Sequence, residues 1–523
     1  MDTTQDQISG KIRSIVILGG GTAGWITAAK LAKQLNLKQN PEYQVTLIES
    51  PDIPIIGVGE GTWPTMRKTL SELGVDEAEF IRECGATFKQ GTRFVNWRNE
   101  PERGENHYYH LFSSIYDPAD FNLAPYWRSG LAGNDSYAAA VSAQGAVCEQ
   151  GLAPKLITTP QYDGIMSYAY HLDAGKFSQF LARFAVSELG VTHKLANLAS
   201  VEFAENGDIA ALRLDSGDRQ PGDLFIDCSG FRSLLLGEAL GVGFKSASDV
   251  LLTDTAIAIQ MPYESEDCPI PCVTSSTAQT AGWIWDISLQ NRRGTGHVFS
   301  SAHMSEDEAE SILRGYLGRG AESLDARTLH MQIGYRERFW EKNCIAIGLS
   351  AAFVEPLEAS AIFLVEAAAN MVTEMLPDDR QDLAYVQKTF NESFRFRWQK
   401  TIDFIKLHYV LSERDSTFWL DSRSRQTIPD TLAEQLDYWR AHPVSKYQFA
   451  SAFEPFPQES YQYVLYGMQP DQFSDSGVDV LPRVSEAQAR FAQVKKITEA
   501  VLGELIPHRE LVNKAIRYGI PKV

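Results

Sequence analysis

The sequence predicts a mixed α/β (α+β) fold, with a core built on a parallel sheet and an additional, largely helical C-terminal portion. An apolar run, a glycine-rich turn and a helical pattern follow one another over residues 14–35. From about residue 380 onward, helical periodicity and aromatic side chains dominate. We expect residues 1–375 to form the core, with inserted segments that line a substrate site. Residues 376–523 then form a mainly helical portion packed on that core.

The glycine-rich turn predicts a dinucleotide site. Gly19, Gly21 and Gly24 have G-x-G-x-x-G spacing, and a second strand over residues 44–48 ends in Glu49. The three glycines respectively permit a tight turn, admit a pyrophosphate and allow close helix–strand packing. The start of the helix favours phosphate, and the acid is placed to accept hydrogen bonds from a ribose. The expected cofactor-binding residues of this Rossmann-type unit are Gly19, Gly21, Thr22, Ala23, Gly24 and Glu49.

Further elements follow along the chain. Residues 201–214 predict a hairpin around Asn206-Gly207, and residues 223–235 predict a strand that runs into a turn. Residues 250–261 and 282–301 are expected to be extended. Residues 343–348 predict another buried strand, and a long apolar helix is expected over 357–375, after Pro356.

Two of these later segments favour FAD over NAD as the dinucleotide. Residues 226–232 and 343–350 each place a turn after a strand, far from the first motif. Flavoproteins use such strand–turn segments, far along the chain from the first motif, to hold the ribityl chain and isoalloxazine ring of their long cofactor. No second G-x-G-x-x-G motif is present for NAD(P)H. The core is therefore expected to be a Rossmann-type FAD-binding core like that of flavoprotein monooxygenases, which binds FAD without reducing it.

Charge and composition exclude several classes of partner. The formal net charge of −19 disfavours nucleic acid and anionic membranes. No run of eighteen apolar residues and no apolar stretch near residue 1 is present. Six scattered cysteines give no disulfide framework, and Cys268 and Cys272 lack a second ligand pair, which favours free thiols over a metal site. We expect a cytoplasmic protein without a metal and leave a homodimer open.

Four segments taken together resemble the flavin-dependent tryptophan halogenase family. Gly282-Trp-Ile-Trp-Asp-Ile-Ser288 resembles the W-x-W-x-I-P signature, with serine in place of proline. Residues 86–91 resemble the segment with the essential lysine, and residues 57–62 resemble a loop that covers the flavin. Residues 347–358 resemble a flavin- and halide-binding turn, although the usual E-S-T-G is Glu358-Ala359-Ser360-Ala361 here.

The resemblance implies a reaction and two catalytic residues. Reduced FAD (FADH2), O₂ and chloride or bromide yield hypohalous acid, which halogenates an electron-rich aromatic such as indole or a tryptophan-like molecule. A separate NAD(P)H-dependent flavin reductase supplies the reduced flavin. Lys89 is expected to meet the hypohalous acid, by hydrogen bonding it or by carrying the halogen as a haloamine. Glu358 is expected to stabilise the cationic ring intermediate and to help remove its proton.

The resemblance also implies roles for residues around this pair. Trp283 and Trp285 would separate the flavin from the substrate, and backbone amides at Ser360 and Ala361 would bind halide. Glu355 is interpreted as support on the flavin side. Leu349 and Ile362 are expected to contact the flavin. His110 and Phe112 are expected to contact the substrate. Without the resemblance, the two tryptophans would be interpreted as core and Lys89 as a surface lysine.

Two alternatives remain at this stage. An FAD-dependent aromatic hydroxylase (monooxygenase) would normally show a Gly-Asp flavin turn, whereas this chain has Gly348-Leu349-Ser350. A non-catalytic flavin-binding protein would have no need of both Lys89 and Glu358. The sequence leaves open the exact substrate, the position halogenated and the preferred halide. No residues that grip an amino acid substrate can be matched in 437–463.

Overall fold

The predicted start of the fold is confirmed. The structure, a computed structural model, describes residues 10–53, 59–104, 106–113, 121–449, 451–468 and 481–522. Strand β1 (Ser14–Leu18), helix α1 (Thr22–Leu35) and strand β2 (Gln44–Glu49) follow in order, and β1 and β2 pair in parallel. The apolar residues of β1 are buried, as expected for a strand with both faces covered.

A six-stranded sheet carries the glycine-rich turn. Its order is β20-β21-β12-β1-β2-β8, and all neighbours pair in parallel except β20 with β21. Helix α1 contacts α7 (Ala174–Ser187) and α9 (Ser360–Glu374). The remaining strands are β8 (Thr192–Leu195), β12 (Leu224–Asp227), β20 (Trp340–Glu341) and β21 (Cys344–Ala346).

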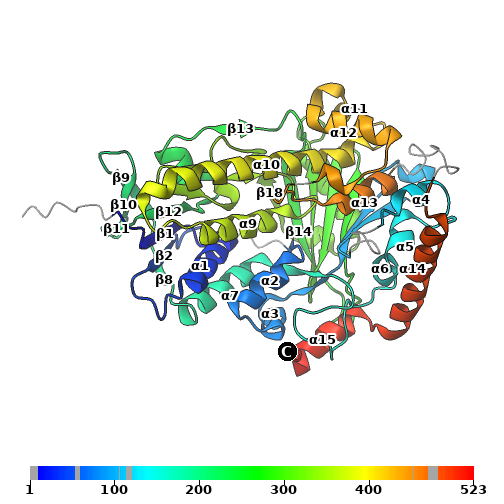
Figure 1. The fold of residues 1–523 in the computed structure, drawn as a ribbon, viewed down its shortest axis with the longest axis horizontal. Helices are drawn as coiled ribbons and strands as arrows, with labels where there is room; N and C mark the ends of the chain where they lie inside the picture. The colour runs from blue at the N-terminus through cyan, green and yellow to red at the C-terminus, as the bar shows by residue number, and fades with distance from the viewer. Residues whose placement is uncertain are drawn as a thin grey trace, which may run out of the picture.

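A seven-stranded sheet forms the centre of the other half of the molecule, seen behind α10 in Figure 1. Its order is β18-β14-β17-β16-β15-β5-β6, antiparallel except between β15 and β5. Trp283, Trp285 and Ile287 alternate along β16 and therefore share one face. Helix α8 (Glu306–Leu317) covers β14 and β17. The strands are β5 (Gly91–Val95), β6 (His107–Leu111), β14 (Thr255–Pro262), β15 (Thr274–Gln279), β16 (Gly282–Ser288), β17 (Arg292–Phe299) and β18 (Ala326–His330).

A three-stranded sheet lies against the tryptophan-bearing face of the large sheet. It consists of β3 (Gly59–Gly61), β7 (Ala169–Asp173) and β4 (Thr87–Lys89), with β7 in the middle. The Thr87 hydroxyl donates to the carbonyl of Ser288 at 2.7 Å. A Cβ on Gly59 would stand 3.1 Å from Ile287, so β3 approaches β16 closely. We call this element the small sheet.

The other predicted strands are also present. β9 (Leu198–Phe203) and β10 (Ile209–Leu214) form the expected antiparallel hairpin around Asn206-Gly207, and β11 (Arg219–Pro221) extends it. A further sheet contains β13 (Phe244–Ser246), β19 (Gly334–Arg336) and β22 (Ala352–Phe353). Between β3 and β7 the chain also forms the helices α2 (Thr65–Leu73), α3 (Glu77–Cys84), α4 (Ala124–Arg128), α5 (Tyr137–Val141) and α6 (Gln144–Glu149).

Beyond residue 380, the described residues form helices and loops, as predicted. Figure 1 shows the long helix α10 running along the molecule from the region of β1 toward α11 and α12. The division at residue 375 remains a prediction. These helices are α10 (Leu383–Val410), α11 (Thr417–Ser422), α12 (Asp430–Ala441), α13 (Gln458–Met468), α14 (Val484–Glu504) and α15 (His508–Tyr518). No helix among the described residues is long and apolar enough to span a membrane.

One predicted boundary is wrong. The helix expected from Leu357 begins at Ser360. Ala359 precedes it with φ 52° and ψ 36°, a left-handed conformation that cannot continue a right-handed helix. The segment that contains Glu358 is therefore a turn.

Candidate active site

The glycine-rich turn has the geometry that a diphosphate requires. Gly19 has φ 119°, and a Cβ there would stand 2.2 Å from the carbonyl oxygen of Cys228. A Cβ on Gly24 would stand 1.9 Å from the carbonyl oxygen of Gly19. A Cβ on Gly21 would meet nothing within 4 Å, so space remains above the start of α1. The turn is therefore closed on the protein side and open where a phosphate would approach the helix N-terminus.

Glu49 lies directly beneath this turn. A Cβ on Gly20 would stand 2.2 Å from the Glu49 carboxyl carbon, so the backbone lies against that side chain. Nε2 of His193 lies 2.9 Å from Glu49 Oε2. The acid is thus placed beside the nucleotide turn, and His193 orients it.

The second predicted flavin segment lies against the first. A Cβ on Gly348 would stand 2.7 Å from the Cβ of Ala23 on α1, and Gly348 has φ 78°. Leu349 follows in the same turn and is half-buried, and Ile362 is buried on α9. The structure thus brings segments more than 300 residues apart to one end of α1.

Lys89 is buried on the small sheet, contrary to what its residue type alone suggests. Its side chain crosses toward β3, where Nζ lies 2.9 Å from the position of a Cβ on Gly61. Nζ also lies 5.3 Å from the centre of the Phe112 ring. Burial lowers the pKa of Lys89 to about 8, and the negative charge of Glu358 opposes part of that shift.

Glu358 is buried between two histidines. Its Oε2 lies 2.8 Å from His110 Nδ1, and its Oε1 lies 2.8 Å from His408 Nε2, although the second pair is not aligned for a hydrogen bond. On the side away from Glu358, His110 Nε2 lies 2.9 Å from the Ser460 hydroxyl, and His408 Nδ1 lies 2.6 Å from the Tyr108 hydroxyl. Burial acts to raise the pKa of Glu358, but the two histidines outweigh it and bring the pKa to about 2. The carboxylate is therefore held ionised near Lys89.

The turn before α9 lies close to the end of the Lys89 side chain. The Cβ of Ala359 lies 3.5 Å from the position of a Cβ on Gly61, where Lys89 Nζ ends. Ser360 is buried and Ala361 is exposed, both in the first turn of the helix. Ala361 is helical, so glycine is not required there, and the left-handed residue is Ala359.

Contacts on the tryptophan-bearing face hold in place the two indoles that are predicted to separate the flavin from the substrate. The Trp283 indole N–H donates to Glu355 Oε2 at 2.7 Å, and the Tyr409 hydroxyl donates to the same oxygen at 2.6 Å. Trp285 lies over Gly296, where a Cβ would stand 2.1 Å from its ring. Burial raises the pKa of Glu355. Glu355 therefore holds the indole of Trp283 in place.

Aromatic rings gather around His110. The His110 ring is 5.6 Å from Phe404 and 6.5 Å from Phe456. Phe456 in turn stacks on Phe404 at 3.9 Å and lies 5.0 Å from Trp63. The Trp63 indole N–H donates to the backbone carbonyl of Glu358 at 2.8 Å. These rings surround the Glu358 side of the site with flat apolar surfaces.

Several of these residues were not predicted individually. They are Trp63, Tyr108, Phe404, His408, Phe456 and Ser460. Of these, only Phe404 and His408 carry a sequence signal, because they lie in Asp403-Phe-Ile-Lys-Leu-His-Tyr409, a further stretch that resembles the family. The others come together only through the contacts of α10 and α13 with the sheets.

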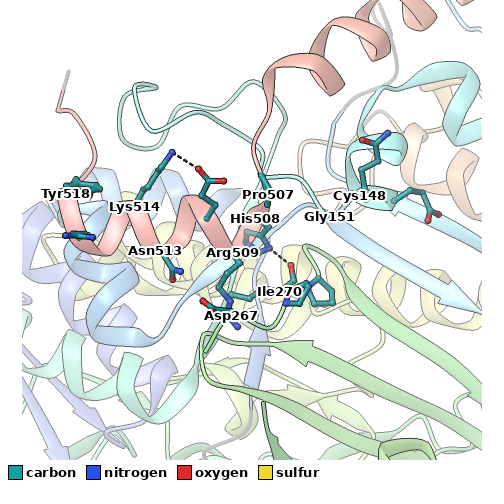
Figure 2. A pocket seen from close by; sticks show the side chains of 16 residues that line it. Cys148, Gly151, Asp267, Ile270, Pro507, His508, Arg509, Asn513, Lys514 and Tyr518 are labelled. Carbon is teal, nitrogen blue, oxygen red and sulfur yellow. Dashed lines mark hydrogen bonds and ion pairs between the residues drawn. The ribbon is translucent and has the colours of Figure 1, made fainter. Parts of the chain in front are cut away.

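A surface groove of about 780 Å³ lies away from this cluster, between α15 and residues 267–271 (Figure 2). One lining residue, His508, connects it to the small sheet. His508 Nε2 accepts from the backbone N–H of Phe88 at 3.0 Å, and Nδ1 lies 2.9 Å from the carbonyl oxygen of Ile270, a contact drawn as a dashed line beside the His508 label in Figure 2. Burial lowers the pKa of His508 to about 4, so the ring is neutral. His508 thus supports the strand of Lys89 from outside.

The glycine-rich turn, the adjoining second segment and the buried Lys89, with the charge of Glu358 nearby, are the features expected of a flavoenzyme. The sequence profile of the tryptophan halogenase family matches residues 14–482. A crystal structure of a tryptophan halogenase from Shewanella frigidimarina superposes with a TM-score of 0.95 at 44% identity, covering 98% of this chain and 99% of that one. The chain therefore belongs to the tryptophan halogenase family.

Other relatives agree with this assignment. A tryptophan 7-halogenase of Kutzneria sp. is 37% identical, with 82% of each chain covered. The structure of a tryptophan C-6 flavin-dependent halogenase (chlorinase) from taromycin biosynthesis has a TM-score of 0.88 at 33% identity, covering 97% of this chain and 100% of that one. The predicted Rossmann-type FAD-binding fold and flavin-dependent halogenase function are confirmed over the hydroxylase and non-catalytic alternatives.

Proposed function

We propose that this halogenase uses FADH2, O₂ and chloride or bromide to halogenate an electron-rich aromatic ring, such as indole or a tryptophan-like molecule. One observation carries this proposal. Lys89 Nζ lies 5.3 Å from the Phe112 ring and is close enough to Glu358 for that carboxylate to act on its pKa, and Glu358 in turn lies 2.8 Å from His110, which packs against Phe404. Flat apolar walls suit a flat heteroaromatic substrate. The relatives named as tryptophan 6- and 7-halogenases support the same substrate class.

The cofactor would be held by the two adjoining segments at the start of α1. Gly19, Gly21, Thr22, Ala23 and Gly24 would hold the diphosphate, and Glu49 would accept hydrogen bonds from the ribose. Leu349 and Ile362 would contact the flavin. When bound, reduced FAD would give two electrons to O₂, so that one oxygen atom leaves as water and the other, by oxidising the halide, ends in hypohalous acid.

Lys89 would bring the halogen to the substrate side. As an ammonium, its Nζ donates a hydrogen bond to hypohalous acid and makes the halogen more electrophilic. As a neutral amine, it bonds to the halogen and releases water. Because burial brings the pKa of Lys89 to about 8, both forms exist near neutral pH. Trp283 and Trp285 would keep the substrate from the flavin, so oxygen transfer to the ring is excluded.

Glu358 would act on the cationic intermediate that forms when the halogen adds to the aromatic ring. Its carboxylate, held ionised by His110 and His408, stabilises that positive charge and accepts the proton that leaves the ring carbon. The aromatic ring thus exchanges one hydrogen for one halogen. Backbone N–H groups of Ser360 and Ala361 would hold the halide at the start of α9.

A separate NAD(P)H-dependent flavin reductase would provide FADH2 in the cytoplasm. The absence of a second G-x-G-x-x-G motif supports this division of labour. All six cysteines are free thiols, as a reducing compartment favours. Assembly as a homodimer remains a prediction.

The test compares Lys89→Met with wild type for halogenated product and for flavin reoxidation. Methionine keeps most of the length and apolar stem, so a loss reports on the amine. We expect product to disappear while FAD binding and reoxidation stay near wild type. Lys388→Met, which alters an exposed lysine on α10, is the matched control and should keep full product. Wild-type product from Lys89→Met would remove Lys89 from the mechanism.

A further inference from the structure

His171 is a buried histidine with one nitrogen left unpartnered. It lies at the centre of the small sheet, on β7, where it pairs with Gly61 on β3 and Thr87 on β4. Its Nε2 lies 2.8 Å from the Thr274 hydroxyl. Within the described part of the chain, its Nδ1 has no hydrogen-bond partner, although it is shielded from solvent. An unsatisfied buried polar atom is costly, so it calls for a ligand that the protein itself does not provide.

The ring of His171 is next to the end of the Lys89 side chain. Lys89 pairs with Ala169 across β4 and β7, so its side chain emerges on the same face of the small sheet as that of His171. Its Nζ then ends 2.9 Å from the position of a Cβ on Gly61, and Gly61 is the cross-strand partner of His171. The lysine side chain therefore crosses the sheet diagonally, from its own pair with Ala169 to the neighbouring cross-strand pair of His171 and Gly61. Ala169 and Gly61 leave the room for this crossing.

The same face meets the tryptophan partition. Thr274, the partner of Nε2, precedes Ser276 by two positions on β15, and Ser276 pairs with Trp285. Thr274 and Trp285 therefore share one face of the large sheet. His171 thus stands in the layer between the small sheet and the tryptophan-bearing face of the large sheet, on the same face of the small sheet as Lys89. Burial, and next the charge of Lys89, lower the pKa of His171 well below 6.5, so the ring is neutral.

We propose that His171 Nδ1 hydrogen-bonds hypohalous acid beside Lys89 and thereby retains the oxidant on its way to the substrate. The inference rests on the proposed function. Hypohalous acid carries one O–H donor and oxygen lone pairs, so it satisfies Nδ1 in either tautomer of the ring. Thr274 fixes the ring through Nε2, and Lys89 Nζ provides the second contact. His171 would therefore set how much oxidant reaches the substrate and how much escapes.

Two substitutions separate the nitrogens of the ring. Asparagine places an amide atom where Nδ1 stands, two bonds beyond Cβ, whereas glutamine places one where Nε2 stands. His171→Gln keeps the bond to Thr274 and loses the proposed ligand contact, and His171→Asn does the reverse. If His171→Gln does not fold, His171→Phe keeps a flat ring at this position without either nitrogen, and its difference from His171→Asn then reports on the Nδ1 contact.

The experiment measures halogenated product per flavin reoxidised, together with hypohalous acid captured in bulk solution by a diketone trap. We expect His171→Gln to lower this ratio about three- to tenfold, the effect of one neutral hydrogen bond, with a matching rise in trapped oxidant. His171→Asn should stay near wild type. The KM for the aromatic substrate should not change in either variant.

His297→Gln is the matched control. His297 is also buried with an unpartnered Nε2, but its Nδ1 lies 3.0 Å from the carbonyl oxygen of Ala309 on α8, on the far face of the large sheet. This variant should leave the ratio unchanged. A wild-type ratio in His171→Gln, an equal loss in His171→Asn, or the same loss in His297→Gln would each overturn the inference. The proposed function fails separately, if the wild type yields no halogenated product.

Discussion

Replacing Lys89 with methionine should stabilise the protein while abolishing its reaction. Lys89 is 1% exposed, and among the described residues no carboxylate lies within ion-pair distance of its Nζ. Burial lowers its pKa from 10.5 to about 8. Each pKa unit corresponds to about 1.4 kcal/mol, so holding the ammonium in the folded state costs roughly 3 kcal/mol. Methionine fills similar space and carries no charge to desolvate.

The pH dependence follows from the sign of this shift. Because the folded pKa lies below the unfolded value, the full cost is present below pH 8 and disappears as the pH rises toward 10.5. Lys89→Met should therefore gain up to about 3 kcal/mol of unfolding free energy at pH 7, and this gain should shrink between pH 8 and 10.5. Urea unfolding of both proteins across this range measures it.

Lys155→Met is the control for this experiment. Lys155 is equally buried, but its Nζ lies 3.0 Å from Glu77 Oε2. Its removal leaves a buried carboxylate without its cation, so the variant should lose about 3–5 kcal/mol. A loss of stability at pH 7 in Lys89→Met, or a gain independent of pH, would refute the assignment of Lys89 as an unpaired buried cation.

The remaining predictions concern the cofactor turn and the carboxylate. Gly21→Val should abolish FAD binding, measured by flavin fluorescence, with little change in Tm, because the site of its Cβ is open; normal binding would place the cofactor elsewhere. Gly24→Ala should instead lower the Tm, since its Cβ would stand 1.9 Å from a carbonyl oxygen, and an unchanged Tm would contradict this packing. Glu358→Gln should slow product formation about tenfold or more, with FAD binding intact, because the amide keeps the shape and loses the charge; an unchanged rate would exclude a role for the charge.

The sequence predicted the backbone features of this protein well. The G-x-G-x-x-G turn, the hairpin at Asn206-Gly207 and the late strand at 344–346 are local signals, because their residue types restrict the backbone directly. The start of α9 was misplaced because nothing in the residue type of Ala359 indicates a left-handed conformation.

The site itself was only partly accessible from the sequence. The tryptophan signature and the lysine segment identified Trp283, Trp285 and Lys89 through resemblance. The burial of Lys89 could not be predicted, because it depends on Gly61 and Phe112 from other strands and loops. His408 reaches Glu358 from the middle of α10, a contact that no periodicity encodes.

The hydrogen bond between Phe88 and His508 joins residues 420 positions apart. During synthesis on the ribosome, the strand of Lys89 emerges long before the residue that satisfies its edge. Until His508 follows, the nascent chain presents an unpaired N–H one residue from the lysine. A prematurely terminated chain that retains the flavin turn would therefore lack a firmly seated lysine. The contact at the edge of this strand therefore forms only after residue 508 is made, whereas the contacts described above at the glycine-rich turn lie within residues 19–348.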